Sequence, residues 1–244
     1  MHDLSALHIR LGADIRAIRS PMCRSQLVTT VENMPLPLPS RRLLLPFGAA
    51  TLMALVLLVV PAPGSVSVVG TRWLAALGSA IPNVELASEI GLALLAATTI
   101  STAAFAWIRH PERRARLLAG AAGVGLAYAA SEGLKLLFAQ PRPCTRWSIA
   151  TECPPAGDWS LPSNHATLAF GATVVIAIAV GRWWVTCSAL ALAALVAAGR
   201  VAQGVHYVHD VAMGAVLGLA VTAALVAATA TWQRRSAAAR SSLG

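Results

Sequence analysis

The sequence contains few charged residues and only one lysine. Asp, Glu, Lys and Arg make up 12% of its 244 residues, while hydrophobic residues make up 57% and the mean hydropathy is +0.66. This composition excludes an ordinary soluble domain and leaves a soluble all-α protein with unusually apolar helices as the alternative to a membrane protein. Several apolar runs reach about 18 residues, the length needed to cross a bilayer core of roughly 30 Å. We therefore expect a polytopic membrane protein.

Other absences narrow the possible chemistry. The four cysteines show no CxxC or Cys/His spacing that would indicate zinc. Cys144 and Cys153 flank a short loop and form either a disulfide or two free thiols. No apolar segment near the start has the character of a signal peptide. No cluster of carboxylates offers a site for Mg²⁺, so neither a metal nor another cofactor is expected.

The arginines lie mainly between or beyond the apolar runs. The net charge of +9 would suit a nucleic-acid partner, but the arginines cluster in the N-terminal segment, in residues 109–116 and in residues 232–244. Lys and Arg are enriched in segments that stay in the cytoplasm. This distribution predicts a plasma-membrane protein with both termini in the cytoplasm and no nucleic-acid partner.

Six apolar runs predict an all-α bundle of about six transmembrane helices within residues 43–231. They cover residues 43–60, 84–108, 117–138, 164–181, 183–200 and 211–231. Residues 1–42 are polar, basic and rich in proline, which predicts a flexible cytoplasmic tail, and residues 232–244 are expected to form a second cytoplasmic tail. Residues 61–83 are broken by Pro and Gly, and Trp73 favours a short helix at the membrane interface.

With the N-terminus inside, residues 61–83, 139–163 and 201–210 lie outside the cytoplasm. Most of the polar residues at the edges of the apolar runs belong to these outer segments or lie next to them. An ionisable side chain inside a membrane segment costs about 2.5–3.5 kcal/mol on insertion scales, so such residues indicate a functional site. We therefore expect an active site on the outer face of the membrane.

Lys135 and Arg142 form the first group of these residues. Lys135 either extends to the lipid headgroups, pairs with Glu132 three residues earlier, or binds an anion. Arg142 lies between Pro141 and Pro143, which restrict its backbone. A guanidinium held in this way is suited to bind phosphate oxygens with two parallel hydrogen bonds.

Residues 162–165, Pro-Ser-Asn-His, form the second group and mark the start of a helix. Ser163 is a candidate N-cap before the apolar run that follows. The free N–H groups and the dipole of such a helix end bind anions. An ordinary capped helix with His165 at the membrane interface is the alternative interpretation, and this motif alone does not separate the two.

The third group runs from Arg200 to Asp210. His206 and Asp210 are four residues apart, so on a helix the carboxylate bonds one imidazole nitrogen and leaves the other free to attack. Arg200 lies six residues before His206, about 240° around a straight helix, so we expect a break at Gly204 between them. His209 is predicted to point away from the face shared by His206 and Asp210 and to take no part.

Together these groups resemble the three signature motifs of the type 2 phosphatidic acid phosphatase (PAP2) superfamily. The pattern K-x6-RP runs from Lys135 to Pro143, PSNH covers residues 162–165, and R-x5-H-x3-D runs from Arg200 to Asp210. Asn164 departs from the family's usual glycine, but Asn tolerates a left-handed backbone, so the turn can be retained. Gly199 stands where the family usually has a serine, which removes one possible hydroxyl donor.

The resemblance implies a role for each of these residues. His206 is the nucleophile that forms a phosphohistidine, Asp210 orients it, and His165 protonates the leaving oxygen. We expect the charge of Asp210 to raise the pKa of His206. The groups that bind the phosphoryl oxygens are Lys135, Arg142, Ser163, Arg200 and the backbone N–H of Asn164.

The expected function is hydrolysis of a lipid phosphate or diphosphate at the bilayer edge. The resemblance to bacterial undecaprenyl (polyprenyl) diphosphate phosphatases makes such a diphosphate the expected substrate, with phosphatidic acid or phosphatidylglycerophosphate as the alternative. A transporter or scaffold on the same fold is the non-enzymatic alternative, which the presence of all the catalytic residues disfavours. A haloperoxidase is disfavoured because the haloperoxidases that share this core are soluble. Membrane lipids are the other expected partners.

Overall fold

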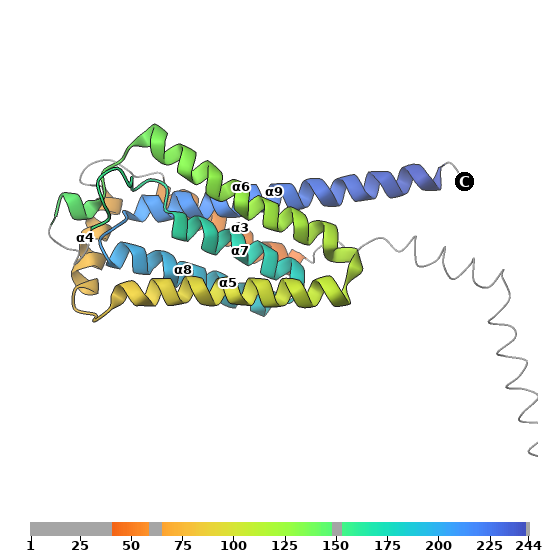
Figure 1. Ribbon diagram of the computed structural model, residues 1–244, viewed down its shortest axis with the longest axis horizontal. Coiled ribbons are helices and arrows are strands. Elements are labelled where there is room, and N and C mark those ends of the chain that lie inside the picture. The colour runs from red at the N-terminus through yellow and green to blue at the C-terminus, as the bar shows by residue number, and fades with distance from the viewer. Residues whose placement is uncertain (1–40, 59–64, 148–152, 243–244) are drawn as a thin grey trace, which may run out of the picture. The chain divides into compact units, whose positions relative to one another are not determined.

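The computed structural model describes residues 41–58, 65–147 and 153–242, and within these ranges the chain is helical and contains no strand. The helices are α3 (Arg41–Leu58), α4 (Val66–Gly78), α5 (Val84–Arg109), η1 (Pro111–Arg113), α6 (Arg114–Phe138), η2 (Pro143–Thr145), α7 (Asn164–Val180), α8 (Trp183–Ala202) and α9 (Val208–Ser241), as Figure 1 shows. The expected all-α class is confirmed.

The six predicted apolar runs coincide with α3, α5, α6, α7, α8 and α9. By length and composition, four segments are able to cross a membrane: α5, the stretch Pro111–Thr145 that contains α6, α8 and α9. α3 and α7 are shorter, so the count of six spans remains a prediction. α9 continues past the predicted boundary at residue 231 and ends at Ser241. The predicted tail 1–42 lies outside the described residues, except for Arg41 and Arg42, which begin α3.

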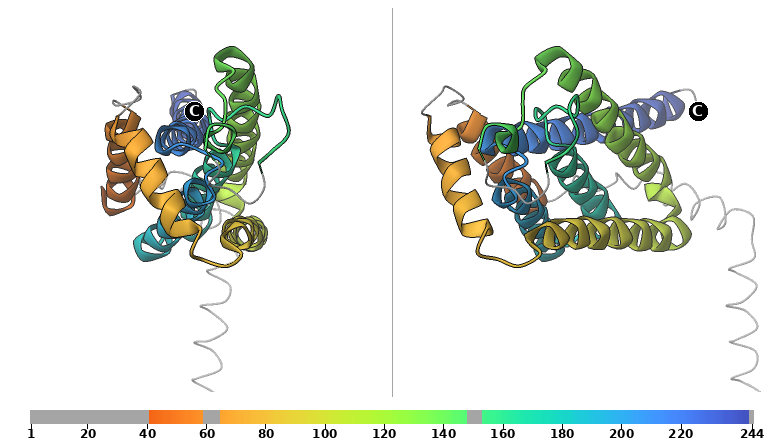
Figure 2. Two further views of the ribbon diagram at one scale, coloured as in Figure 1. Left: turned by 90° about the vertical axis from the view of Figure 1, so that its left-hand side faces the viewer. Right: turned by 60° about the vertical axis from the view of Figure 1, so that its left-hand side comes forward.

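α7 is the central helix of the bundle. Its sequence is apolar on every side, which is typical of a helix that other helices surround. Its buried side chains include Ala166, Ala169, Phe170, Val174 and Ile176. It packs against α5, α6, α8 and α9, as the views in Figures 1 and 2 show. The first turn of α7 is therefore held from several sides.

Small residues let α9 approach α7 closely. Gly214 and Gly218 of α9 face the backbone of α7, next to the carbonyl groups of Ser163 and Thr167. A methyl group built on Gly214 would lie 2.5 Å from the carbonyl oxygen of Ser163. Helices in membranes commonly pack through such small residues, because lipid supplies no hydrophobic driving force between them. These glycines fix the start of α7 against the start of α9.

The up-and-down order of the helices brings four helix ends together. α6 and α8 end, and α7 and α9 begin, at one end of the bundle, while η1 and the turn at Gly181 lie at the other. α4 also lies at the first end and contacts α8 and α9, at a steep angle to both (Figure 2). A helix in the segment 61–83 was predicted, and α4 confirms it. All three sequence motifs fall at this end.

Candidate functional site

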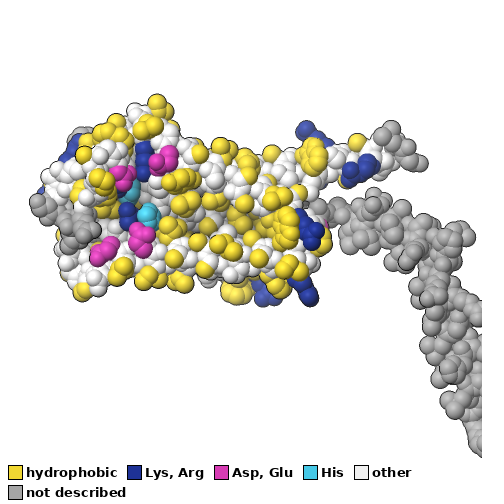
Figure 3. All heavy atoms as spheres, viewed as in Figure 1, with side chains coloured by type: hydrophobic (Ala, Val, Ile, Leu, Met, Phe, Trp, Pro, Cys, Tyr) yellow, Lys and Arg dark blue, Asp and Glu magenta, His cyan; other side chains and the backbone are white. Residues whose placement is uncertain are grey.

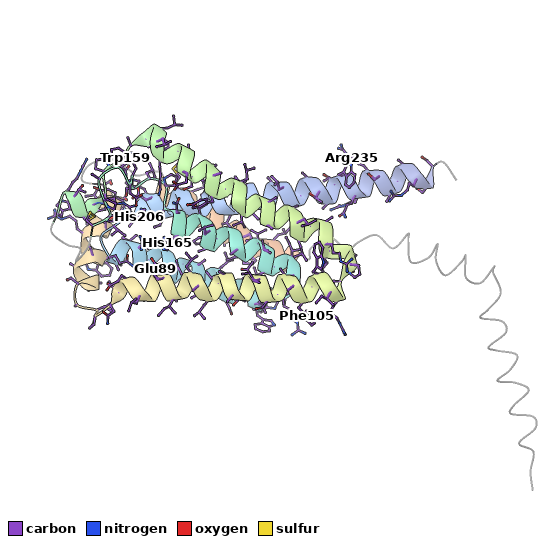
Figure 4. All side chains as sticks on the ribbon, in the orientation of Figure 1. Glu89, Phe105, Trp159, His165, His206 and Arg235 are labelled. Carbon is purple, nitrogen blue, oxygen red and sulfur yellow. A yellow bond between two sulfur atoms is a disulfide. The ribbon has the colours of Figure 1, made fainter. Side chains whose placement is uncertain are left out.

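Each predicted site residue lies in a terminal turn or in a loop at one end of the bundle. Lys135 lies in the last turn of α6 and Arg142 just before η2; Ser163, Asn164 and His165 begin α7; Arg200 lies in the last turn of α8, His206 just before α9, and Asp210 in the first turn of α9. Figure 4 shows His165 and His206 at this end, close to Glu89 of α5. The fold thus brings the three motifs together.

His206 lies between α8 and α9, in a loop that turns at Gly204. Gly204 has a φ of 72°, a left-handed conformation that favours glycine, so the predicted break is confirmed. Nδ1 of His206 lies 3.5 Å from Oδ2 of Asp210, and Nε2 lies 3.2 Å from Nη1 of Arg142. Because a guanidinium can only donate, Nε2 accepts from Arg142 and the ring proton lies on Nδ1, toward the carboxylate. This is the tautomer expected of a nucleophile whose Nε2 attacks.

Burial lowers the pKa of His206 to about 4. The hydrogen bond and charge of Asp210 act in the opposite direction, but desolvation of the charged imidazole outweighs them, and Arg142 and Arg200 add to the lowering. Asp210 thus acts to raise this pKa, as expected, but burial reverses the net shift. At neutral pH the imidazole is unprotonated, which is the form able to attack phosphorus.

Asp210 is completely buried and accepts hydrogen bonds on both carboxylate oxygens. Oδ2 accepts from the backbone N–H of Tyr207 at 2.8 Å and from the hydroxyl of Ser160. Oδ1 accepts from Nε2 of Gln140 at 2.8 Å. Such hydrogen bonds compensate a buried carboxylate for the loss of water. They also fix the position of the carboxylate beside His206.

His209 contacts Asp210, so the prediction that it points away from the site is wrong. Its Nε2 lies 3.1 Å from Oδ1 of Asp210 and 3.1 Å from Oε1 of Gln140. The helical-face argument failed because Asp210 bends back to accept from the backbone of Tyr207 and so lies over the start of α9, within reach of His209. Two neighbouring histidines therefore contact the same carboxylate.

Ser67 of α4 sets the tautomer of His209. The Ser67 oxygen accepts from the backbone N–H of His209 at 3.1 Å and lies 2.8 Å from Nδ1 of the same residue. The Ser67 hydroxyl therefore donates to Nδ1, and the ring proton lies on Nε2, facing Gln140 and Asp210. α4 supports the site through this contact, which no sequence motif indicated.

Arg142 is 4% exposed and is held by carbonyl groups as well as by charge. Its Nε donates to the carbonyl oxygen of Asp158 at 2.8 Å, and its Nη1 donates to the carbonyl oxygen of Val205 at 3.0 Å. Its Nη2 lies 2.8 Å from Oδ1 of Asp158. The guanidinium is thus fixed next to His206, and the phosphate-binding role expected of it stays a prediction.

Lys135 and Arg200 supply the other two cations. Nζ of Lys135 lies 3.2 Å from Oε1 of Glu132 and 3.4 Å from Oδ1 of Asp158. Lys135 therefore pairs with Glu132 and also lies among the other candidate site residues. Nη1 of Arg200 donates to Oε1 of Gln203 at 2.9 Å and lies 3.1 Å from Oε1 of Glu89. Both cations are largely buried, and in both cases the carboxylate partner is more exposed than the cation.

Ser163 is the N-cap residue of α7, as predicted, but its hydroxyl does not cap the helix. The side chain is fully buried, and Oγ has no hydrogen-bond partner within the part of the chain that the structure describes. An unpaired polar atom in such a place is rare in native proteins and suits a site that binds a ligand. The first turn of α7 begins at the next residue, and the N–H groups of a first turn have no partners within the helix.

Asn164 is the first residue of α7 and does not have a left-handed backbone. The expectation of a left-handed Asn164 was therefore wrong. Its side chain instead forms hydrogen bonds to α6. Its amide donates to Oε1 of Glu132, and its Oδ1 accepts from the hydroxyl of Ser131 at 2.8 Å. The residue that replaces the family's glycine thus ties the start of α7 to α6, close to Lys135.

Sequence reasoning also missed the polar residues Glu89, Gln140, Asp158 and Ser160. Glu89 is the most instructive, because its Oε1 lies 2.9 Å from Nε2 of His165. It is a carboxylate inside the predicted apolar run 84–108, which is the kind of signal that singled out Lys135. The other three belong to the predicted outer segment 139–163, where nothing in the sequence distinguished them from ordinary loop residues.

Cys144 and Cys153 form a disulfide, which decides between the two alternatives left open by the sequence. Their Cα atoms are 5.7 Å apart. The bond joins η2, which follows Arg142, to the segment that carries Asp158. Figure 3 shows Lys or Arg, Asp or Glu, and His side chains gathered at the same end of the bundle, with hydrophobic side chains beside them.

Comparisons with known proteins show which sequences this chain is similar to. Residues 116–234 match the family model described as "PAP2 superfamily". The chain is also 34% identical over 116 residues to decaprenylphosphoryl-5-phosphoribose phosphatase of Mycobacterium tuberculosis, in both strain CDC 1551 / Oshkosh and strain ATCC 25618 / H37Rv. The aligned segment covers 48% of this chain and 63% of the length of each relative. No solved structure matches the chain.

Proposed function

Because residues 116–234 match the model of the PAP2 superfamily, we propose that this protein is a membrane-embedded phosphatase that hydrolyses a lipid-linked phosphate without a metal. The observation that carries the proposal is the setting of His206. Its Nε2 is unprotonated and lies 3.2 Å from Arg142, while its Nδ1 faces Asp210. A nucleophile oriented by a carboxylate beside cations is the arrangement that phosphoryl transfer to a side chain requires.

In the first step, Nε2 of His206 attacks phosphorus. The N–P bond forms as the bond between phosphorus and the leaving oxygen breaks, and His165 gives its proton to that oxygen. Arg142, Lys135 and Arg200 bind the phosphoryl oxygens, together with Ser163 and the N–H groups at the start of α7. Asp210 stabilises the positive charge that His206 gains on attack.

In the second step, water attacks the phosphohistidine. His165, now neutral, accepts a proton from the water as the new P–O bond forms and the N–P bond breaks. His206 is released unprotonated at Nε2, and inorganic phosphate leaves. The pKa of His206, lowered to about 4 by burial, favours the return of the neutral nucleophile.

We infer that the substrate carries a polyprenyl tail. A polyprenyl (undecaprenyl-type) diphosphate remains the expected substrate from the motifs. The name of the relatives favours a second candidate, a terminal phosphate on a sugar that a prenyl phosphate carries. Phosphatidic acid and phosphatidylglycerophosphate are the alternatives with acyl tails. We also propose that the site faces away from the cytoplasm, because most of the arginines outside the site lie in segments expected on the inner side.

Phosphate release by the purified full chain in detergent tests this function. The substrates are undecaprenyl diphosphate, a prenylphosphoryl sugar 5-phosphate, phosphatidic acid and phosphatidylglycerophosphate. We expect release from at least one prenyl-linked compound, and complete loss of release in His206→Ala. The variant should elute from size exclusion as wild type does. Wild-type protein that releases no phosphate from any of them, or an active His206→Ala variant, would contradict the proposal.

A further inference from the structure

Two carboxylates lie within the cation site. Oε1 of Glu89 lies 2.9 Å from Nε2 of His165 and 3.1 Å from Nη1 of Arg200. Oδ1 of Asp158 lies 2.8 Å from Nη2 of Arg142 and 3.4 Å from Nζ of Lys135. Each oxygen therefore bridges two of the groups assigned above to the phosphoryl group or to the leaving oxygen. These are positions that oxygens of a bound phosphate ester would otherwise take.

The carboxylates are the more exposed partners in these pairs. The side chains of Glu89 and Asp158 are 53% and 41% exposed, whereas those of Lys135, Arg142 and Arg200 are 9%, 4% and 13% exposed. The carboxylates thus lie at the surface of the protein, while the cations are buried behind them. Because each carboxylate is already partly exposed, it can be rehydrated when a more highly charged anion takes its place beside the cation.

The cations keep their places without these carboxylates. Carbonyl oxygens of Asp158 and Val205 hold Arg142, and Oε1 of Gln203 holds Arg200. Lys135 keeps its contact with Glu132, which the side chain of Asn164 fixes. Removing the charge of Glu89 or Asp158 should therefore free the cations without displacing them.

Close packing of α5 brings Glu89 to the site. Gly199 of α8 faces Ser88, and a methyl group built on Gly199 would lie 3.0 Å from Cβ of Ser88. A serine at position 199, as the family usually has, would crowd this contact. The departure at Gly199 thus allows α5 to lie where Glu89 reaches Arg200. α5 lies outside the segment that matches the family model.

Asp158 interacts favourably with the cations. Burial alone raises the pKa of its carboxyl group, but the hydrogen bond and charge of Arg142 and the charge of Lys135 hold the pKa below its ordinary value. The carboxylate is therefore charged at neutral pH and competes with any other anion for the same two cations.

Resting on the function proposed above, we propose that Glu89 and Asp158 are internal competitors that make the site selective for dianionic phosphate. A terminal phosphate carries a charge of about −1.5 to −2 at pH 7, whereas the phosphodiester of a bilayer lipid carries one negative charge. A site with three cations at a lipid surface would otherwise fill with phosphodiester headgroups, which are abundant there. The dianion displaces both carboxylates, and the monoanion does not.

Two single variants, Glu89→Gln and Asp158→Asn, test this proposal in the purified full chain. The readouts are the inhibition constant of orthovanadate and the inhibition of phosphate release by phosphatidylglycerol, a monoanionic diester. We expect the vanadate constant to fall about threefold to tenfold in each variant, as expected for the loss of a partly exposed ion pair and a nearby negative charge. Phosphatidylglycerol should inhibit both variants more strongly than it inhibits wild type. Structural damage would weaken vanadate binding, so tighter binding separates the two explanations.

Glu85→Gln is the matched control. Glu85 lies one turn earlier in α5, and among the described residues its side chain makes no ion pair. This variant should bind vanadate as wild type does. Vanadate binding that tightens in neither test variant, or that tightens equally in the control, overturns the proposal. If Asp158→Asn does not fold, Glu89→Gln alone decides.

Vanadate binding measured by calorimetry keeps the inference separate from the enzymatic function. If the wild-type protein releases no phosphate from any lipid, the proposed function fails, but the affinities of wild type, Glu89→Gln and Glu85→Gln still decide whether the carboxylates compete with an anion. Unchanged affinity in every test variant that folds, together with normal turnover in wild type, would overturn the inference and leave the function intact.

Discussion

The close approach of α9 to α7 makes Gly214 a sensitive position, although no catalytic or binding role is assigned to it. In Gly214→Ala, the added methyl group would lie 2.5 Å from the carbonyl oxygen of Ser163, and ordinary contact begins at 3.4 Å. The carbonyl must therefore move by about 0.9 Å (3.4 − 2.5), since a backbone atom cannot rotate away as a side chain does. The movement shifts Ser163 and the first turn of α7.

The size of the effect follows from this displacement. A misplacement of about 1 Å in a catalytic array costs about 100-fold in rate, so we expect kcat/KM of Gly214→Ala to fall by about this factor. Added volume at a close helix contact also costs about 1–3 kcal/mol of stability. The loss of activity should exceed the loss of folded protein, because the molecules that remain folded carry a displaced Ser163 and are less active.

The assay is phosphate release per folded molecule, with the folded fraction taken from size exclusion in detergent. Gly125→Ala in α6 is the control, because a methyl group there has open space around it. That variant should keep wild-type kinetics and should be slightly stabilised, since Ala favours a helix over Gly. Gly214→Ala with wild-type kcat/KM would refute the reasoning and show that the start of α7 tolerates movement.

Three further predictions follow from the site. Because the pKa of His206 is lowered to about 4 in the folded protein and is about 6.5 in an unfolded chain, the unfolded state binds the extra proton between these values. The free energy of unfolding should therefore fall by about 3 kcal/mol as pH drops from about 6.5 to 4. The drop in melting temperature over this range should be smaller in His206→Gln than in wild type. Equal drops would contradict the lowered pKa of His206. Orthovanadate should inhibit competitively while EDTA has little effect, and activity that EDTA abolishes and Mg²⁺ restores would contradict a metal-independent mechanism. After reduction of intact cells, an impermeant maleimide should label Cys144 and Cys153 but not a cysteine placed at residue 112, and the reverse pattern would place the site in the cytoplasm.

Much of the site could be predicted because its chemistry is unusual for its surroundings. Lys135 is the only lysine of the sequence and lies at the end of an apolar run, which indicated a functional residue. The spacing of His206 and Asp210 and the glycine at 204 then indicated how the third group folds. These are local signals, in which a residue type conflicts with its neighbours or a backbone requires glycine. The approximate positions of the helices could also be predicted, because an apolar run is a local feature of the sequence.

What the sequence could not supply depends on contacts between distant segments. The pKa of His206 is set by burial under neighbouring helices, which outweighs the nearby charge of Asp210. The role of His209 depends on Ser67, more than a hundred residues earlier. Glu89 acquires its partners only because Gly199 lets α5 approach. No spacing within one motif contains these facts, so they require the packed structure.

The length of α9 has a practical consequence for imaging. Its 34 residues span about 51 Å, well beyond a bilayer core of about 30 Å, and Figure 1 shows its last turns extending past the ends of α5 and α6. A helical partner joined in phase to these turns would continue the same axis as a stiff rod, and each added residue would rotate it by about 100°. Small membrane proteins are difficult to align in electron-microscopy images. The end of α9 is a point at which a rigid helical marker can be fused, and the number of residues in the junction sets the marker's orientation.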